Sequence, residues 1–105
     1  MRQKSTIKKN GLERIRKSLK SLDNEIKERY KAEVISVFGS YARGTEKKDS
    51  DIDIVVRFKR NATLFDFVGL AEFLETKLHK KIDLVPERAI REELKDRILQ
   101  EAVAV

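Results

Sequence analysis

The sequence predicts an α/β fold of the α+β type, a small mixed β-sheet with helices packed against it. Short runs rich in β-branched and aromatic residues alternate with longer segments in which apolar residues recur every three or four positions. The chain has 105 residues, enough for one domain with one modest core. We therefore expect a single domain over residues 12–105, preceded by a basic N-terminal arm over residues 1–11.

Three segments have the periodicity of amphipathic helices. In residues 12–30 the apolar positions recur at steps of three and four, with charged residues in most of the gaps. A second helix begins at Thr63, where a Thr-x-x-Asp sequence is typical of a helix start, and ends near Lys80, whose charge suits a helix C-terminus. Residues 90–102 repeat apolar residues every four positions and predict a last helix. Residues 1–10 are basic and polar and are expected to be frayed.

Three apolar runs predict the strands of the sheet, at residues 34–38, 52–58 and 81–85. Between the first two lies a polar loop over residues 39–50, with a short helix expected near Ala42. The predicted order is helix, strand, turn, strand, helix, strand, helix.

The composition excludes several classes of function. The chain has 24 Lys and Arg against 18 Asp and Glu, a net charge of +6, which favours polyanions but does not choose among nucleic acid, a nucleoside triphosphate and an acidic protein. The absence of cysteine excludes disulfides, thiolate zinc sites and cysteine nucleophiles. No apolar run approaches the roughly 20 residues of a membrane span, and the N-terminus lacks a secretory signal. We expect a cytosolic protein that does not contact membranes.

Two aspartates open the second predicted strand. Asp51 and Asp53 are two residues apart, so in a strand their side chains share one face, with Cα atoms about 6.5 Å apart. Carboxylates this close repel each other unless a cation or water screens them, and Mg²⁺ prefers such oxygen ligands. The alternative is an ordinary strand edge that carries two exposed aspartates.

A third aspartate, Asp83, stands among apolar residues of the third predicted strand. An unpaired carboxylate buried there would be costly, so the side chain is expected to project from the sheet. It could form a salt bridge with a Lys or Arg. If the third strand lies beside the second, Asp83 could instead join Asp51 and Asp53 in a site for two metal ions about 3.5–4 Å apart, as in phosphoryl transfer.

The loop after the first predicted strand has the residues of a phosphate site. Gly39 lets the backbone turn sharply and approach a ligand, and backbone N–H groups with the Ser40 hydroxyl can hold phosphate oxygens. Arg43 could neutralise phosphate charge with its forked donors. The alternative is a plain Gly-Ser turn followed by an exposed arginine.

Together these features resemble the DNA polymerase beta-like nucleotidyltransferase superfamily, whose signature is an apolar strand, Gly-Ser, a spacer of this length and Asp-x-Asp. The chain is most similar to its small stand-alone branch, the minimal nucleotidyltransferases, often encoded as antitoxins beside HEPN-domain toxins. The resemblance covers residues 12–105, and it is carried by the segments 37–44, 50–56, 81–85 and 97–103.

The resemblance implies a Mg²⁺-dependent nucleotidyltransferase with two metal ions and ATP as substrate. It assigns nucleotide binding to Gly39, Ser40, Arg43 and Ser50, and both catalysis and metal binding to Asp51, Asp53 and Asp83.

The resemblance also implies a HEPN-type toxin as partner, to which the enzyme adds AMP on a tyrosine. A chain of this size has no second lobe, so the base pocket and the grip on the acceptor are expected from another protein, while self-association stays open and nucleic acid is not required. The apolar residues 102–105 could be an adhesive surface or could complete the core. Two other functions stay open, an antitoxin that neutralises its toxin by contact alone and a small nucleic-acid-binding protein.

Overall fold

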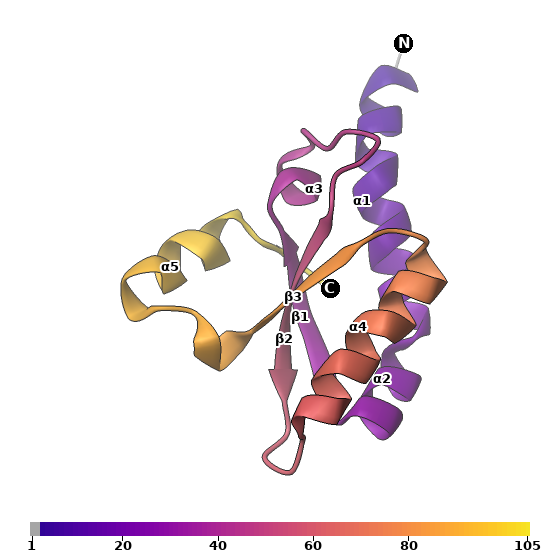
Figure 1. The fold of residues 1–105 in the computed structure, drawn as a ribbon. Helices are drawn as coiled ribbons and strands as arrows, with labels where there is room; N and C mark the ends of the chain where they lie inside the picture. Colours follow the sequence, from indigo (N-terminus) through magenta and orange to yellow (C-terminus); the bar gives the residue numbers. More distant parts are fainter. Residues whose placement is uncertain (1–2) are drawn as a thin grey trace.

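The computed structural model of the protein describes residues 3–105, with side chains described from Gly11 onward. Its helices are α1 (Gln3–Ser21), α2 (Asp23–Tyr30), α3 (Ser40–Arg43), α4 (Leu64–Leu78), the 3₁₀ helix η1 (Glu87–Ala89) and α5 (Glu92–Glu101). Its strands are β1 (Ala32–Phe38), β2 (Ile52–Phe58), β3 (Ile82–Pro86) and β4 (Val103–Ala104). The predicted fold class, a small mixed sheet with helices packed against it, is confirmed (Figure 1).

The four strands form one sheet in the order β3-β2-β1-β4. Strand β1 is antiparallel to both β2 and β4, whereas β2 and β3 are parallel. Parallel neighbours need a crossover connection, and α4 provides it. Strand β3, the next strand along the chain, therefore lies directly beside β2 in the sheet. This neighbourhood places Asp83 of β3 near β2.

Helices α1, α2 and α4 cover one face of the sheet, while α5 lies on the other side (Figure 1). Alternate residues of β2 point to the covered face, where Ile52 and Ile54 are buried in a cluster with Leu19, Leu70 and Leu74 of the helices. This confirms the prediction that Ile52, between Asp51 and Asp53, and Ile54, after them, pack in the core. No helix among residues 3–105 is long and apolar enough to cross a membrane.

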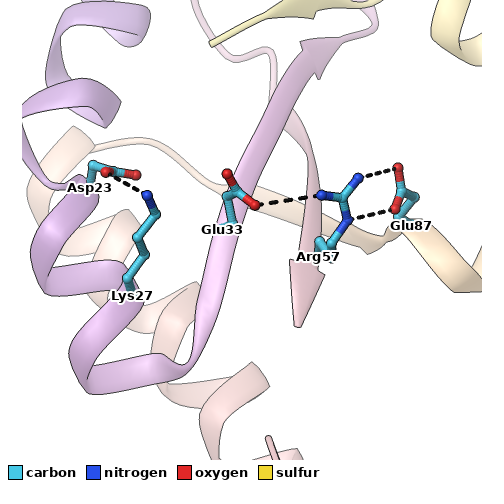
Figure 2. A network of polar contacts seen from close by, with 5 residues as sticks. All are labelled: Asp23, Lys27, Glu33, Arg57 and Glu87. Carbon is cyan, nitrogen blue, oxygen red and sulfur yellow. Dashed lines mark hydrogen bonds and ion pairs between the residues drawn. The ribbon is translucent and has the colours of Figure 1, made fainter. Parts of the chain in front are cut away.

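The face opposite these three helices carries the polar residues of the strands. At the end remote from Asp53, Arg57 donates hydrogen bonds to the Glu87 carboxylate at 3.0 and 3.3 Å and lies 3.6 Å from a Glu33 oxygen (Figure 2). The hydrogen bond from Arg57 lowers the pKa of Glu87. Arg57 is thus fully paired by carboxylates of neighbouring elements.

The N-terminal region differs from the prediction of one helix over residues 12–30. The structure divides it into α1 and α2 at Leu22, whose N–H still bonds the Ser18 carbonyl at 3.1 Å. The backbone of α1 is helical from Gln3, so the expectation of a frayed segment is wrong for residues 3–10, and residues 1–2 lie outside the described part.

The C-terminal region also differs from the predicted helix over residues 90–102. The helix α5 is shorter, η1 precedes it, and a two-residue strand follows that the sequence did not predict. Strand β4 pairs with Ser36 and Val37 of β1, and Val105 packs against the core. Of the two roles expected for residues 102–105, completing the fold is the one observed.

Candidate active site

Two of the predicted acidic residues lie side by side on neighbouring strands. Asp53 of β2 and Asp83 of β3 are direct partners in the parallel register. Phe38, the last residue of β1, is the partner of Asp53 on its other side. Register partners point their side chains to the same face, so both carboxylates project from the face opposite the three covering helices. Asp53 is half-buried and Asp83 is exposed, as expected for a residue that projects from the sheet.

The electrostatics of Asp53 follow from its burial and from its acidic neighbours. Its pKa is raised from 3.8 to about 6, first by burial, then by the charge of Asp83, by a hydrogen bond with Asp83 and by the charge of Asp51. The nearby Arg43 guanidinium acts in the opposite direction. A half-buried carboxyl group beside a second carboxylate keeps its proton to a higher pH, unless a cation takes the place of the proton. Asp53 and Asp83 therefore form a coupled pair.

Asp51 is exposed and lies just before β2, and its charge reaches Asp53 more weakly than that of Asp83. Among residues 3–105 no three His, Cys, Asp or Glu side chains are gathered closely enough to hold a metal ion together. The structure therefore brings together Asp53 and Asp83, and leaves Asp51 as a predicted third ligand. The repulsion within the pair and its oxygen-only donors fit Mg²⁺.

Gly39 is placed directly against this pair. Its φ of 75° and ψ of −149° belong to a region that residues with a side chain rarely adopt. A Cβ atom at this position would lie 3.1 Å from Cγ of Asp53 and closer still to Oδ2. The absence of a side chain at position 39 is thus what leaves room for the Asp53 carboxylate.

The other predicted phosphate-binding residues lie around this turn. Ser40 begins the short helix α3, which confirms the helix expected near Ala42. Arg43 ends that helix, and its Nη1 atom lies 3.8 Å from a carboxylate oxygen of Glu101 in α5. Ser50 is engaged within the loop, since its Oγ accepts a hydrogen bond of 2.7 Å from the Lys47 N–H.

Glu101 is a residue of this site that sequence reasoning missed. It belongs to the C-terminal helix and touches Arg43 only because α5 folds back beside the loop. Nothing in the local sequence of either residue signals the contact. Arg43, whose charge acts on Asp53, is therefore paired with Glu101 in this structure. Both side chains are about half exposed, so the contact contributes little to stability.

The raised pKa of Asp53 makes stability depend on pH in a defined direction. Between about pH 4 and pH 6 the folded protein keeps a proton that the unfolded chain has released. The contribution of this group is fully present below about pH 4 and is lost as the pH rises through the folded pKa. In EDTA, we expect the melting temperature of the wild type to fall from pH 4 to pH 7 relative to that of Asp53→Asn.

Thermal melts of both proteins across this range, with and without Mg²⁺, measure the effect. Adding Mg²⁺ at neutral pH should raise the melting temperature of the wild type more than that of Asp53→Asn, because the cation relieves the repulsion. A difference between the two proteins that is the same at every pH would show that the carboxylates do not interact.

Several known proteins are similar to this chain in fold and in sequence. The protein adenylyltransferase MntA of Thermococcus cleftensis is 39% identical over 94 residues, which span 90% of this chain and 95% of that protein. A solved minimal nucleotidyltransferase superposes with a TM-score of 0.75 and 35% identity, covering 92% of this chain and 95% of its own. A toxin-antitoxin crystal structure with AMP-PNP gives a TM-score of 0.62 and 28% identity, over 76% of this chain and 66% of that one.

The matched region includes all the elements that position the carboxylate pair. Residues 12–105 match the family described as the nucleotidyltransferase domain, from the middle of α1 to the end of the chain. The resemblance inferred from the Gly-Ser turn and the aspartates is confirmed. The chain belongs to the nucleotidyltransferase domain family.

Proposed function

We propose that this protein is a Mg²⁺-dependent protein adenylyltransferase that transfers AMP from ATP to a tyrosine hydroxyl of a HEPN-type toxin. The observation that carries the proposal is the placement of Asp53 and Asp83 as register partners on neighbouring strands, with Gly39 packed against Asp53. Two acidic groups placed together in this way can bind a divalent cation, and through it a triphosphate. The name of the Thermococcus relative supports protein as the acceptor class.

The residues of the site have distinct proposed roles. Asp53 and Asp83, with Asp51 beside them, would hold Mg²⁺, which when bound neutralises the triphosphate and polarises the α-phosphate. The Gly39–Ser40 turn offers backbone N–H groups and a hydroxyl to the β- and γ-phosphates. Ser50 lines the same loop as a further proposed nucleotide contact.

Arg43 must change partner for this reaction. In the structure it lies beside Glu101, but a triphosphate in the turn would be a stronger, multiply charged acceptor for its forked donors. Because Arg43 and Glu101 are both about half exposed, breaking their ion pair costs little free energy. Arg43 would then offset the charge on the phosphates rather than that of Asp53.

The transfer itself is a substitution at the α-phosphorus of ATP. The acceptor hydroxyl oxygen forms a bond to that phosphorus, while the bond from it to the oxygen that bridges the α- and β-phosphates breaks. Pyrophosphate leaves with the electron pair of the broken bond. The proton of the hydroxyl passes to the carboxylate of Asp83, the more exposed acid of the pair, and from there to solvent. Positioning and charge neutralisation are the protein's contribution.

The acceptor must be brought by a partner. The elements described within residues 3–105 form one sheet with its core on one face, and they include no second lobe that could hold a base and an acceptor. The toxin-antitoxin structure with AMP-PNP supports a toxin as this partner and an adenine nucleotide as substrate. We therefore place the acceptor tyrosine on the toxin, presented to the face that carries Asp53 and Asp83.

Labelled ATP tests the proposal directly. The protein is incubated with Mg²⁺ and the product of the neighbouring reading frame, with ATP labelled either at the α- or at the γ-phosphate. We expect the α label to appear on the partner, and the γ label to appear in pyrophosphate and not on protein. Peptide mass spectrometry of the labelled partner then identifies the modified side chain.

Two outcomes contradict the proposal. Transfer of the γ label would indicate a kinase rather than an adenylyltransferase. Neutralisation of the toxin that survives in an Asp53→Ala variant, without label transfer by the wild type, would favour an antitoxin that acts by contact alone. The matched control is Asp96→Asn on the exposed surface of α5, which removes the same charge away from the carboxylate pair and should transfer label like the wild type.

A further inference from the structure

A cavity of about 550 Å³ lies on the side of the sheet opposite the carboxylate pair. It is bounded by α1, by the loop between α3 and β2, and by the turn that joins α4 to β3, segments that Figure 1 shows meeting near the start of β2. Its floor is apolar and includes Ile15, Tyr41 and Leu78. Its volume is that of a small-molecule site rather than a gap between side chains.

The rim of this cavity is strongly basic. Five lysine or arginine side chains and His79 line it, against one glutamate among the described lining residues; the five are Arg14, Lys47, Lys48, Lys77 and Lys80. None of the ion pairs found within residues 11–105 involves any of the five. Of the five, Lys77 also contacts an aromatic ring, since its Nζ atom lies 5.7 Å from the centroid of Phe73. By contrast, Arg57 is held by two glutamates at the far end of the sheet (Figure 2).

Unpaired cations gathered around one concavity repel one another and focus a positive potential into it. The fold fixes this arrangement, because the Lys80 ammonium donates a hydrogen bond of 2.6 Å to the Lys48 carbonyl and so ties the loop to the turn. An anion in the cavity would relieve the repulsion from three separate segments at once. The charge therefore points to a ligand with more than one negative group.

Glu46, the acidic side chain among the described lining residues, sets a second requirement on the chemistry of the ligand. Its Oε1 atom is buried with no hydrogen-bond partner. Its Oε2 atom packs where Gly11 of α1 has no side chain, since a Cβ there would come within 2.7 Å of it. A buried acceptor without a donor is costly, and a ligand could supply the donor once the Glu46 side chain turns into the cavity. The ligand should thus carry hydroxyl or amino groups as well as negative charge.

The cavity is separate from the proposed active site. Ile52 lines it, whereas the neighbours Asp51 and Asp53 alternate to the opposite face of the strand. Lys47 and Lys48 nevertheless precede Ser50 and Asp51 in the same loop. A ligand in the cavity would contact the loop between α3 and β2 on one side of the sheet, while the proposed catalytic residues lie on the other side.

We propose that this cavity is a second site, which binds a nucleotide. The lysines would take the phosphates, the apolar floor the flat face of the base, and Glu46 a ribose hydroxyl or base amino group. An acidic peptide fits less well, because its carboxylates offer no donor to Glu46. The nucleotide can be free or can be the end of an RNA strand, since both present the same chemistry. This inference does not rest on the proposed reaction.

Binding measurements on the whole chain test the site. Fluorescence titrations with a labelled ATP and with a short labelled single-stranded RNA are run in EDTA, which withholds the cation that the carboxylate pair needs. The variant Lys47→Gln/Lys48→Gln is compared with Lys59→Gln/Arg60→Gln, which removes the same charge from the turn after β2. We expect the first to bind about tenfold more weakly than the wild type, with a salt slope smaller by about two. The second should bind like the wild type.

The outcomes separate the possible sources of the ligand. Affinity for ATP alone assigns the site to a free nucleotide, and affinity for RNA alone assigns it to a strand end. Equal losses in the two double variants would overturn the proposal in favour of diffuse attraction to net charge, and so would displacement of either probe by polyglutamate. If the loop variant melts below the assay temperature, Arg14→Gln on α1 provides the same test from another segment.

Discussion

Replacing Gly39 with alanine is expected to lower AMP transfer by at least about 10²-fold, because a displacement of the reacting groups by about 1 Å costs that much. The added Cβ would overlap the Asp53 carboxylate, which must turn away from Asp83 to make room. A carboxylate is the flexible end of a side chain, so moving it lowers the stability of the fold only slightly. The same movement takes the carboxylate out of the position that the reaction requires. The backbone at φ 75° and ψ −149° adds strain of roughly 1–3 kcal/mol. Initial rates of label transfer and thermal melts measure the two effects separately.

The chain offers a control in Gly44, which has the same φ of 75° but a ψ of 21°, in the left-handed region where a side chain is strained less. A Cβ at Gly44 would meet no atom within 4 Å, so Gly44→Ala introduces backbone strain without the contact to Asp53. We expect Gly44→Ala to melt somewhat below the wild type and to keep most of its activity. Equal activity losses in the two variants would mean that loop strain, and not the position of Asp53, explains the effect of Gly39→Ala.

The second large effect is expected at the carboxylate pair itself. Asp53→Asn and Asp83→Asn should each lower transfer by about 10³-fold, since each removes a charge that the phosphoryl-transfer site requires. Because the two groups act as one unit, the double variant should be little worse than either single one. The same pH-dependent melts should show each asparagine variant to be as stable as the wild type or more stable at neutral pH without divalent cations.

A double-mutant cycle on the rate of label transfer checks this. Asp96→Asn serves as the charge-matched control and should retain wild-type rates. Losses that multiply in the double variant would indicate that Asp53 and Asp83 act independently. A single variant that keeps most of its activity would remove that residue from the catalytic set, and Asp51→Asn measured in the same series tells whether the predicted third ligand belongs to it.

Much of the fold around the candidate site could be predicted, because strand periodicity and helix capping are visible in the local sequence. The bounds of β2 were predicted correctly, since Ile52 and Ile54 alternate with acidic residues over a strand that is buried on one face. The start of α4 was equally clear, because Thr63 donates its backbone N–H to the Asp66 carboxylate at 2.8 Å, as the Thr-x-x-Asp signal implies. Periodicity and capping depend on residues close together in the chain, so both can be recognised in the sequence.

Features that depend on distant contacts could not be predicted. The apolar stripe of the first helix runs on through Leu22, so the pattern carried no sign of the break between α1 and α2. Strand β4 has two residues and exists through its pairing with β1. The contact of Arg43 with Glu101 and the basic cavity likewise join segments that lie far apart along the chain.

The weak attachment of α5 has a consequence for access to the sheet. None of its side chains is buried, and Leu94 and Leu99 are 41% and 38% exposed. Peeling this helix from the protein uncovers little additional apolar area, so the free energy of such a local opening lies far below that of global unfolding. Amide protons of α5 should exchange with solvent well before those of β2. A macromolecule that docks on the acidic face would therefore displace α5 at a lower free-energy cost than any strand of the sheet.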